Sequence, residues 1–287
     1  MTVTAQIVDL HCHSTQSDGI LSPKALVSRA SAVNVAVLAL TDHDTISGLH
    51  DAHAQAQVDG VRLINGCEFS CQWQGRTIHI VALDFDQQHP VLRRLLDQQA
   101  QRRESRNRAI AERLQKVGFD EAYIKALAQL SASGDQSAQL GRPHFAKAMV
   151  AEGFVGSETQ AFSRYLGSGK LGDVKQHWPD IDEVVTATTA ASGTAVLAHP
   201  LKYSMTRTKL RALTAQFAEF GGRAIEVVSG VQNAAATRDM AQLAKRFQLM
   251  ASCGSDFHAP AWSELGRFSA LPEGLTAIWE DWLPSER

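Results

Sequence analysis

Short apolar runs recur along this chain, and each one ends in histidine or acidic side chains. The clearest examples read VDLHCH from residue 8, VLALTDHD from residue 37, VLAHP from residue 196 and ASCGSDFH from residue 251. Continuous apolar runs of this length are typical of parallel strands that helices cover on both faces. Such strands close into a barrel or a doubly wound sheet, and in a barrel the loops after the strands meet at one face. The side chains that end these runs are therefore predicted to share one site.

The first run carries two histidines one residue apart, and an aspartate follows in the next loop. Side chains alternate between the two faces of a strand, so His11 and His13 are predicted to share one face and Leu10 and Cys12 the other. Two imidazoles on one backbone are typical of sites for zinc, manganese or iron, and Asp18 is expected to reach the same space. The competing interpretation is ordinary surface at the end of a strand, since short motifs also match by chance.

Composition narrows the class of protein and of partner. With 287 residues and 44% hydrophobic content, the chain suits one large domain or a barrel with an insertion. Its net charge of -2 and pI near 6.6 give no general attraction to nucleic acid or to an anionic membrane, so we expect no DNA partner and only local phosphate binding. The sequence shows no signal peptide and no membrane-spanning apolar run, which indicates a soluble cytoplasmic protein. The cysteines fit no disulfide or zinc-knuckle spacing and are expected to be reduced and buried: Cys12, Cys67, Cys71 and Cys253.

A carboxylate and an imidazole are predicted to meet in a hairpin. Glu68 follows a predicted strand at residues 61–65, and Gln74-Gly75 then suits a two-residue turn. Counting back from that turn sets Ser70 opposite His79, so His79 lies diagonal to Glu68 on one face. The alternative for His79 is a half-buried strand histidine with one satisfied hydrogen bond. Two further histidines, at positions 50 and 53, lie on a predicted helix away from any strand end, and we interpret them as surface residues.

Together the strand ends and the hairpin supply six histidines and three carboxylates. One ion of four to six coordination cannot use so many donors, which predicts two or three metal ions that share Glu68 as a bridge. Nitrogen and oxygen donors without thiolate indicate manganese, iron or zinc and do not choose among them; manganese is the ion that we expect first. The predicted ligands are His11, His13, Asp18, His43, Glu68, His79, His199, Asp256 and His258.

The composition changes between residues 89 and 176. We interpret this part as a helical domain inserted into a barrel formed by residues 1–88 and 177–287. A long polar helix is predicted from Val91 to Val117, with arginines at positions 102, 103, 106 and 108. These arginines form either a solvated face or a basic flank for a phosphate-rich substrate. The last part of the chain is expected to contribute aromatic packing, through Trp262, Trp279 and Trp282.

A sharper candidate for substrate binding is the sequence GRPH at residues 141–144. Its proline suits the first turn of a helix, so Arg142 stands at the positive helix end, where a guanidinium and backbone N–H groups bind phosphate. We expect Arg142 and Arg207 to hold a phosphate from opposite sides, with His144 and Lys170 as further substrate-binding candidates. Lys170 lies in a glycine-rich stretch that is either a lid or a linker.

These motifs resemble the polymerase and histidinol phosphatase (PHP) superfamily of metal-dependent phosphoesterases, over nearly the whole chain. The matching segments are Asp9-Leu10-His11-Cys12-His13 with Asp18, Thr41-Asp42-His43-Asp44, Glu68, His79, Ala198-His199-Pro200 and Asp256-Phe257-His258. The resemblance implies an α/β fold, a distorted (β/α)7 barrel with an inserted small helical domain, around a trinuclear metal centre. It assigns the ligands to three ions, the first bound by His11, His13, Glu68 and Asp256, the second by Glu68, His79 and His199, and the third by Asp18, His43 and His258.

The resemblance also implies a function. The helical insertion, with GRPH and the later Arg207, is similar to the branch that contains 3′,5′-nucleoside bisphosphate phosphatases and a 5′-3′ exoribonuclease. We therefore expect a phosphoric monoester hydrolase that removes the 3′-phosphate of nucleoside 3′,5′-bisphosphates by attack of a metal-activated hydroxide. Exoribonuclease action on the 5′ end of short RNA is the alternative. Asp42 is expected to orient a ligand imidazole.

Three other functions fit parts of this pattern. A histidinol-phosphate phosphatase shares the family's ligands, but the arginines of the insertion favour a nucleotide. Metal-dependent amidohydrolases also carry an early His-x-His, but they commonly place a lysine between metals, and we expect no lysine at a suitable strand end. A non-catalytic metal-binding module usually lacks some of the ligands, whereas this set is complete.

Overall fold

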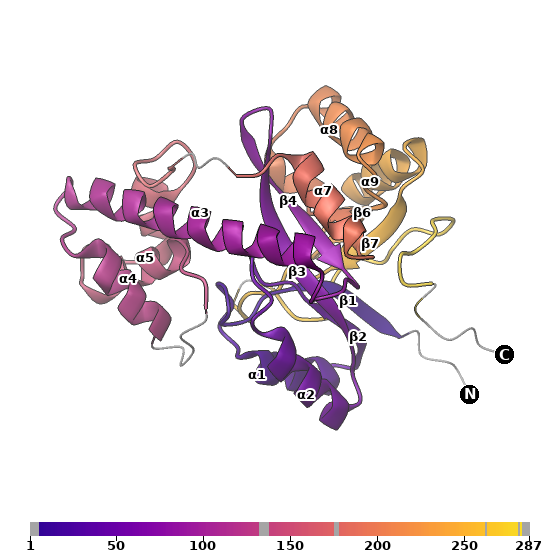
Figure 1. Ribbon diagram of the computed structural model, residues 1–287, viewed down its shortest axis with the longest axis horizontal. Helices are drawn as coiled ribbons and strands as arrows, with labels where there is room; N and C mark the ends of the chain where they lie inside the picture. Colours follow the sequence, from indigo (N-terminus) through magenta and orange to yellow (C-terminus); the bar gives the residue numbers. More distant parts are fainter. Residues whose placement is uncertain (1–5, 132–137, 175–177, 262, 281, 283–287) are drawn as a thin grey trace.

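The computed structural model describes residues 6–131, 138–174, 178–261, 263–280 and 282, and within them seven strands form one sheet in chain order (Figure 1). The strands are β1 Ile7–Cys12, β2 Val35–Leu40, β3 Arg62–Trp73, β4 Arg76–Leu83, β5 Thr194–Leu197, β6 Ala224–Ser229 and β7 Met250–Gly254. Most neighbours pair in parallel, but β4 runs antiparallel to both β3 and β5. The sheet is therefore mixed, with one hairpin in an otherwise parallel series.

The two ends of the sheet approach each other, so the sheet curls into a nearly closed barrel. Just beyond β7, the backbone of Phe257 bridges to Cys12 at the end of β1, and the N–H of His13 donates to the carbonyl of Phe257 at 2.8 Å. The N–H of Asp256 donates to the carbonyl of His11, also at 2.8 Å. The predicted barrel-like α/β sheet is confirmed, and its seam joins the first segment of predicted ligands to the last.

Helices cover the outside of the sheet, as apolar strands require. In Figure 1, α1 and α2 lie together on one side of the sheet, and α8 and α9 lie on another. The bounds of these outer helices are α1 Pro23–Ala32, α2 Leu49–Asp59, α7 Ile181–Ala190, α8 Arg207–Glu219 and α9 Ala234–Arg246. Side-chain oxygens of Ser22, Thr206 and Asn233 accept N–H groups from the first turns of α1, α8 and α9, which fixes where these helices begin. Of the helices in the described part of the chain, none has both the length and the apolar character needed to cross a bilayer.

Apolar side chains form separate layers on the two sides of the sheet. One cluster fills the barrel and takes alternate strand residues, such as Val8 and Leu10 of β1. Trp279 and Trp282 pack against this cluster, which confirms their predicted packing, while Trp262 lies outside the described residues. A larger cluster packs the outer face of the sheet against the helices.

The predicted alternation holds for His11 and His13 but fails for Leu10 and Cys12. His11 and His13 belong to one group of side chains. Leu10, however, lies in the cluster inside the barrel, whereas Cys12 lies in the outer one. The pairing of β1 with β2 shifts its register between Asp9 and Cys12, which turns the end of the strand relative to its start. A sequence pattern of period two carries no sign of such a shift.

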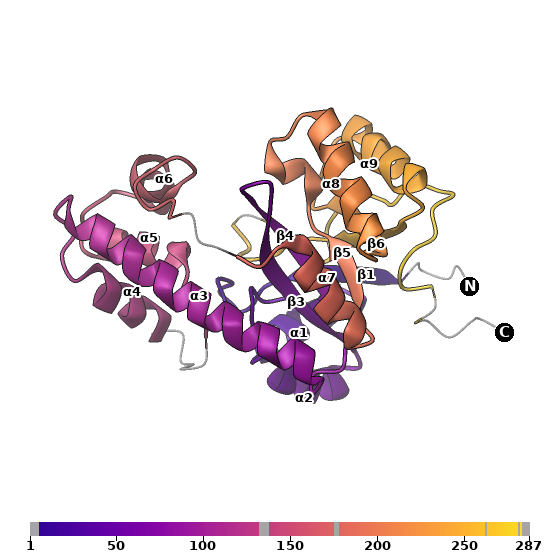
Figure 2. The same ribbon diagram turned by 45° about the horizontal axis from the view of Figure 1, so that its top comes forward.

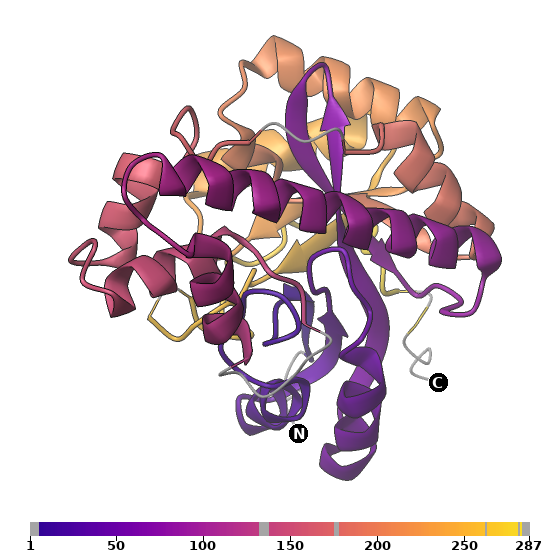
Figure 3. The ribbon, with the colours of Figure 1, turned by 60° about the vertical axis from the view of Figure 1, so that its left-hand side comes forward.

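The long helix α3, Pro90–Gln115, closely matches the predicted helix from Val91 to Val117 and crosses the sheet (Figure 3). Its first turns pack on the main core through Leu92 and Leu96, and its last turns pack in a second apolar cluster through Leu114. One helix therefore joins both clusters, which fixes the direction in which the following segments extend.

The second cluster gathers the remaining helices, which lie together at one end of the molecule (Figure 2). They are α4 Ala122–Ser131, α5 Arg142–Ala151, α6 Glu158–Ala161 and the π-helical turn η1 Phe162–Leu166. A separate apolar cluster is a feature that an inserted helical domain requires. The domain boundaries at residues 89 and 176 stay a prediction, and residue 176 itself lies outside the described residues.

Candidate metal centre

The nine ligands predicted from the sequence lie together at one end of the barrel. Their donor atoms form four overlapping groups, in each of which every atom lies within 4.8 Å of the others. The groups are His13, Asp18, His43 and His258; His11, Glu68 and His199; His11, His13 and Asp256; and His43, Glu68 and His79. Shared members link the groups, so the nine side chains make one continuous cluster.

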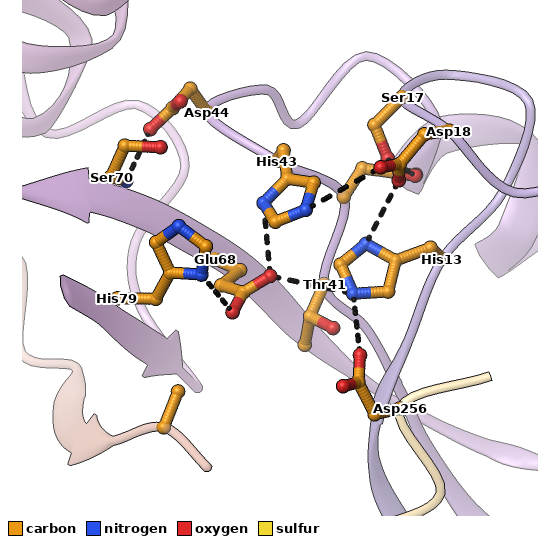
Figure 4. A network of polar contacts seen from close by, with 12 residues as sticks. His13, Ser17, Asp18, Thr41, His43, Asp44, Glu68, Ser70, His79 and Asp256 are labelled. Atoms are coloured by element: carbon orange, nitrogen blue, oxygen red, sulfur yellow. Dashed lines mark hydrogen bonds and ion pairs between the residues drawn. The ribbon is translucent and has the colours of Figure 1, made fainter. Parts of the chain in front are cut away.

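Glu68 on β3 lies in the middle of this cluster, buried and with both carboxylate oxygens facing histidines (Figure 4). One oxygen, Oε1, lies 2.8 Å from Nδ1 of His79 and 2.7 Å from Nε2 of His199. The other, Oε2, faces three more ring nitrogens, those of His43 at 2.9 Å, His11 at 3.3 Å and His13 at 3.4 Å. A carboxylate that serves two sets of imidazoles is well placed to bridge two ions.

The course of β3 and β4 brings Glu68 and His79 together. Ser70 pairs with His79 in the antiparallel register, as predicted, so Glu68 and His79 are diagonal neighbours. β3 runs unbroken through Glu68, whereas the sequence indicated a strand that ended before it. Gly66 permits this course, because a Cβ atom there would lie only 2.5 Å from the carbonyl oxygen of Leu40.

The other two carboxylates lie on either side of His13 (Figure 4). Asp18, in the loop after β1, has oxygens 3.3 Å from Nε2 of His258 and 3.7 Å from Nε2 of His43. Asp256, after β7, places Oδ1 at 3.3 Å from Nε2 of His13. The carboxylates are thus spread through the cluster, so that each one faces histidines from different strand ends.

Backbone conformation helps to aim two of the donors. His199 after β5 and Asp256 after β7 have φ values of 25° and 51°, which few residues other than glycine adopt. At Gly254, the last residue of β7, a Cβ atom would lie 2.4 Å from Cβ of His11, so glycine is required where β7 ends against β1. Strained backbone at several candidate ligands is typical of a functional site.

Carboxylates and imidazoles in the cluster shift one another's pKa values. Burial would raise the pKa of Glu68, Asp18 and Asp256, but the imidazoles around them hold each pKa well below its usual value. Burial lowers the pKa of His13 to about 3, so this imidazole is neutral. At His258 the effect of burial is outweighed by Asp18, which raises the pKa to about 9. The pKa of His11 and His43 is also raised despite burial, mainly by Glu226 and Glu68 respectively. Ionised carboxylates and neutral imidazoles are the forms that bind divalent metals, so metal ions at these three histidines would displace protons.

The donor set fits divalent cations. Within the described residues, buried polar atoms without a hydrogen-bond partner gather here, among them Nε2 of His11, both ring nitrogens of His13 and Oε2 of Glu68. Such atoms raise the free energy of the fold unless a partner such as an ion satisfies them. Oδ1 of Asp256 lies 3.6 and 3.3 Å from the nitrogens of His11 and His13, close to the edge of about 3.4 Å between ligands of a tetrahedral ion.

Two buried carboxylates that the sequence analysis did not single out support the predicted ligands. Glu226 on β6 accepts from Nδ1 of His11 and from the backbone N–H of His199, both at 2.5 Å. With its proton on Nδ1, His11 directs the lone pair of Nε2 towards the cluster. Asp9 accepts from the N–H of Ser255 at 2.9 Å and so ties β1 to the end of β7. The available signal was a lone acidic residue within an apolar strand, since a buried carboxylate requires a partner.

Asp42 supports the cluster differently from the way we expected. It accepts from the N–H and hydroxyl groups of Ser14, at 2.8 and 2.6 Å, and from the hydroxyl of Ser17 at 2.6 Å. These contacts hold the loop that carries Asp18. Among the described residues, no imidazole is a hydrogen-bond partner of the Asp42 carboxylate. The expectation that Asp42 orients a ligand histidine is therefore wrong.

A cleft of about 1310 Å³ opens onto the cluster. Its wall includes Asp18, Asp256 and His258 on the side of the barrel, and Pro143 and Lys170 on the side of the helical segment. A molecule bound in this cleft would therefore contact the predicted ligands and the helical segment at the same time.

Lys202 also lines the cleft, and the sequence analysis missed it. It belongs to η2, the 3-10 turn Pro200–Tyr203 that follows β5, and its ammonium contacts Oδ2 of Asp256. It lies beyond the end of β5, so the expectation that no lysine stands at a suitable strand end is not contradicted, but a lysine does reach the cluster from the turn that follows. The signal was present, since Lys202 follows the predicted ligand His199 by three residues.

The GRPH segment forms the cap and first turn of α5, as predicted. Nη1 of Arg142 donates to the carbonyl of Leu166 at 3.1 Å, which ties α5 to the stretch that carries Lys170. His144 is buried, and its Nδ1 accepts from the N–H of Gly141 at 3.1 Å. Burial lowers the pKa of His144 to about 4, so its imidazole is a neutral helix cap near neutral pH and supplies no positive charge to a phosphate.

Arg207 is not brought to the cluster. It begins α8, as predicted, but its side chain is 79% exposed and its Nη2 lies 2.5 Å from Oδ2 of Asp239 on α9. It lines a separate cavity of about 280 Å³ that residues of η2, α8 and α9 surround. The structure therefore gives no support to the expected clamp of Arg142 and Arg207 around one phosphate. The sequence placed the helix correctly but could not place this side chain.

Arg103 on α3 neither belongs to a solvated face nor forms a flank for substrate. It is buried, and its Nε and Nη2 both lie 2.6 Å from Oδ2 of Asp44. Gln99, one turn earlier, donates to Oδ1 of Asp44 at 2.7 Å and to the carbonyl of Ser70 at 2.6 Å. This network joins α3 to the loop of His43 and to the strand of Glu68.

Known proteins are similar in sequence to this chain over almost its whole length. The PHP domain family matches residues 9–185. A 5′-3′ exoribonuclease of Haemophilus influenzae is 44% identical, over 95% of this chain and 97% of its own length. A 3′,5′-nucleoside bisphosphate phosphatase of Chromobacterium violaceum is 37% identical, over 96% of this chain and 95% of its own length.

The fold is shared as well. A solved structure described as an amidohydrolase from Chromobacterium violaceum, with bound sulfate and no metal, has a TM-score of 0.88 to this chain. The two sequences are 37% identical, and the match covers 96% of this chain and 95% of that one. The family match at residues 9–185 includes six of the nine predicted ligands, those from His11 to His79. The chain therefore belongs to the PHP domain family, and it is an enzyme that hydrolyses phosphate esters.

Proposed function

We propose that this enzyme hydrolyses the bond between phosphorus and the 3′ oxygen of a nucleotide that also carries a 5′-phosphate, and that RNA 5′ ends are its main substrate. The observation that carries the proposal is the cluster of candidate ligands at the wall of a cleft of about 1310 Å³. Pockets for a single small molecule commonly measure about 300–1,000 Å³, so this cleft has room for more than one nucleotide. The relatedness to a 5′-3′ exoribonuclease supports the same choice.

A nucleoside 3′,5′-bisphosphate is the second candidate substrate, and a relative of 37% identity bears that name. It presents the same chemistry, because in both molecules a 5′-phosphorylated nucleoside carries another phosphate on its 3′ oxygen. A water oxygen bonds to phosphorus, the P–O3′ bond breaks, and the 3′ oxygen takes a proton. The common product is a nucleoside 5′-monophosphate, and the other product is inorganic phosphate or an RNA with a new 5′-phosphate.

Two or three divalent ions, manganese first with iron and zinc as alternatives, are proposed to bind at the nine donors. The resemblance assigns three sets of ligands. The first ion would be bound by His11, His13, Glu68 and Asp256, the second by Glu68, His79 and His199, and the third by Asp18, His43 and His258. When bound, such ions lower the pKa of water and neutralise charge on phosphoryl oxygens. The contribution of the protein is geometry, since Glu226 holds His11 and Asp42 holds the loop of Asp18.

Cations of the helical segment are proposed to bind the 5′-phosphate. Lys170 lines the cleft, and Arg142 begins α5 next to Pro143, which also lines it. One N–H group of Arg142 bonds to Leu166, and a guanidinium has five, so others remain for a phosphate. The 5′-phosphate would then distinguish the end of an RNA from its interior.

Rates on four substrates test this proposal. They are adenosine 3′,5′-bisphosphate, AMP, and one short RNA with and without a 5′-phosphate, each with manganese. We expect release of nucleoside 5′-monophosphate from the bisphosphate and from the 5′-phosphorylated RNA, slower release from the 5′-hydroxyl RNA, and no hydrolysis of AMP, which lacks a 3′-phosphate. Hydrolysis of AMP as the best substrate would contradict the proposal.

Replacing the arginine of GRPH tests the role of the 5′-phosphate. Arg142→Ala should raise KM or lower kcat for 5′-phosphorylated RNA far more than for a small aryl phosphate, which has no second phosphate to bind. The matched control is Arg238→Ala on α9, an exposed arginine outside the cleft, which should change neither. Equal losses on both substrates in Arg142→Ala would contradict this assignment.

A further inference from the structure

We propose that Lys202 is a catalytic residue that binds the phosphoryl group under attack, from the barrel side of the cleft. The inference rests on the proposed function and adds a residue to it. Lys202 lines the same cleft as Asp18, Asp256 and His258, with 53% of its side chain exposed. A phosphate ester that reaches the candidate ligands through this cleft therefore comes close to the ammonium group.

The turn that carries Lys202 is fixed to the metal centre through its backbone and its tyrosine. Oη of Tyr203 donates to the carbonyl of Ala198 at 2.8 Å and accepts from the N–H of His79 at 2.9 Å. The N–H of Lys202 donates to the carbonyl of His199 at 2.9 Å. His79 and His199 are both predicted ligands, so the backbone of Lys202 has a set position relative to the reacting centre.

The contact with Asp256 leaves the ammonium able to bind more than one partner. A lysine has three N–H donors, and in this structure Lys202 contacts Oδ2 of Asp256. Oδ1 of the same carboxylate faces His11 and His13, at 3.6 and 3.3 Å. The two oxygens of Asp256 thus serve different partners, so an ion bound beside the histidines does not compete with Lys202. The remaining donors of the ammonium can bind phosphoryl oxygens next to that ion.

Other cations on the described cleft wall are less suited to this role. Lys170 belongs to the helical segment, and Arg267 forms an ion pair with Glu264 at 3.0 Å. Arg207, which the sequence indicated, lines a different cavity. Among the lysines and arginines of that wall, Lys202 is the one in contact with a predicted ligand. A fixed positive charge there stabilises the negative charge that phosphoryl oxygens carry as the P–O3′ bond breaks.

The test uses the full chain loaded with manganese and compares Lys202→Met, Lys202→Arg and Lys209→Met. Lys209 is an exposed lysine of α8 outside the described cleft wall, so it controls for loss of surface charge. Rates are measured on adenosine 3′,5′-bisphosphate and on a small aryl phosphate. Lys202→Met should lower kcat/KM by roughly 10²-fold on both, because both contain the transferred phosphoryl group. Lys202→Arg should recover part of this loss, and Lys209→Met should match the wild type.

Metal content and phosphate affinity separate this role from simple support of Asp256. After dialysis, Lys202→Met should retain the wild-type ratio of manganese to protein, while calorimetry should show that inorganic phosphate binds about tenfold or more weakly. A loss of activity that follows a loss of manganese, and that excess manganese restores, would overturn the proposal in favour of a structural role.

The two proposals also fail in different ways. A wild-type enzyme without activity on any phosphate ester would overturn the proposed function. A wild-type enzyme that is active, with Lys202→Met equally active on both substrates, would overturn the role of Lys202 alone. A loss of activity in Arg207→Ala and not in Lys202→Met would contradict the role of Lys202 and support Arg207, the residue that the sequence indicated, as the phosphate-binding cation.

Discussion

Glu68 directs its two carboxylate oxygens at different imidazoles, with His79 and His199 on one side and His43 closest on the other. The sequence was sufficient to predict that Glu68 and His79 meet, because the turn at residues 74 and 75 fixes the register of the hairpin. The position of one side chain thus followed from the geometry of a turn several residues away.

Replacing this carboxylate by an amide of the same shape should remove metal. In Glu68→Gln we expect less manganese per protein after dialysis, and a loss of activity greater than the roughly 10–100-fold that an outer partner of a ligand contributes. Mass spectrometry of the metal and the rate of phosphate release measure both. Glu112→Gln, at an exposed position of α3, is the control. Full manganese content in Glu68→Gln would contradict the bridging role.

Residues outside regular patterns were harder to predict. Glu226 is a single charged residue within an apolar strand, and Lys202 is a single charged residue after a histidine. Neither belongs to a repeating sequence pattern, so neither was predicted to contribute to the site. Two histidines were easier to exclude from the ligand set, because they lie far from any strand end in the sequence. His50 is exposed, and His53 bonds through Nε2 to the side chain of Asn65 at 2.7 Å, outside the cluster. The useful signal was therefore position relative to an element, more than residue type.

At the scale of elements, α3 is joined to the metal centre by a buried ion pair. Asp44 Oδ2 binds Arg103, and its other oxygen accepts from Gln99 and from the N–H of Ser70. Breaking a buried pair by removing one partner costs about 3–5 kcal/mol, because the other charge stays buried. Either Asp44→Asn or Arg103→Met alone should therefore lower the free energy of unfolding by about that much.

The double variant Asp44→Asn/Arg103→Met should be less destabilised than the sum of the two single variants. Unfolding in urea measures all three. The exposed pair of Lys24 and Asp51 is the control, and its loss should cost less than about 1 kcal/mol. Strict additivity of the two buried substitutions would show that Asp44 and Arg103 do not depend on each other.

The start of α5 should make stability depend on pH. Burial lowers the pKa of His144 from 6.5 to about 4, so the fold favours its neutral form. The stabilisation is complete above pH 6.5 and is lost as the pH falls towards 4, up to about 3 kcal/mol. In His144→Asn, the amide oxygen can cap Gly141 without titrating. The difference in free energy of unfolding between this variant and the wild type should change over that range, and parallel curves would contradict the prediction.

At the scale of the whole molecule, ions in the cluster would join β1, β3 and β7. An ion at 100 times its dissociation constant stabilises the folded state by about 2.7 kcal/mol. Each kcal/mol shifts Tm by roughly 2–4 °C for a chain approaching this size. A chelator should therefore abolish activity and lower Tm by roughly 5–10 °C.

Manganese should restore both activity and Tm, and calcium should not, because nitrogen-rich sites disfavour a hard oxygen-seeking ion. Differential scanning calorimetry measures the shift. Glu68→Gln, which should bind less metal, provides the control, and its Tm should change little with chelator. A wild-type Tm that is indifferent to chelator would show that ions contribute nothing to the fold.

The sequence was sufficient to predict the barrel-like α/β sheet, because apolar runs that end in polar clusters indicate parallel strands with one shared edge. It did not reveal that β3 continues through Glu68, or that β1 shifts register before Cys12. Both features depend on how a strand meets its neighbours, which no local pattern records. The predicted position of Arg207 at the phosphate finds no support for the same reason, since its partner Asp239 lies on another helix.

The seam between β1 and β7 has a consequence for biosynthesis. His11 and His13 are translated before Asp256 and His258, which share donor groups with them, and more than 200 residues separate the two pairs. A nascent polypeptide therefore cannot complete this cluster until β7 and the segment that follows it have been made. A product that ends before β7 would lack Asp256 and His258, and with them two of the nine predicted ligands.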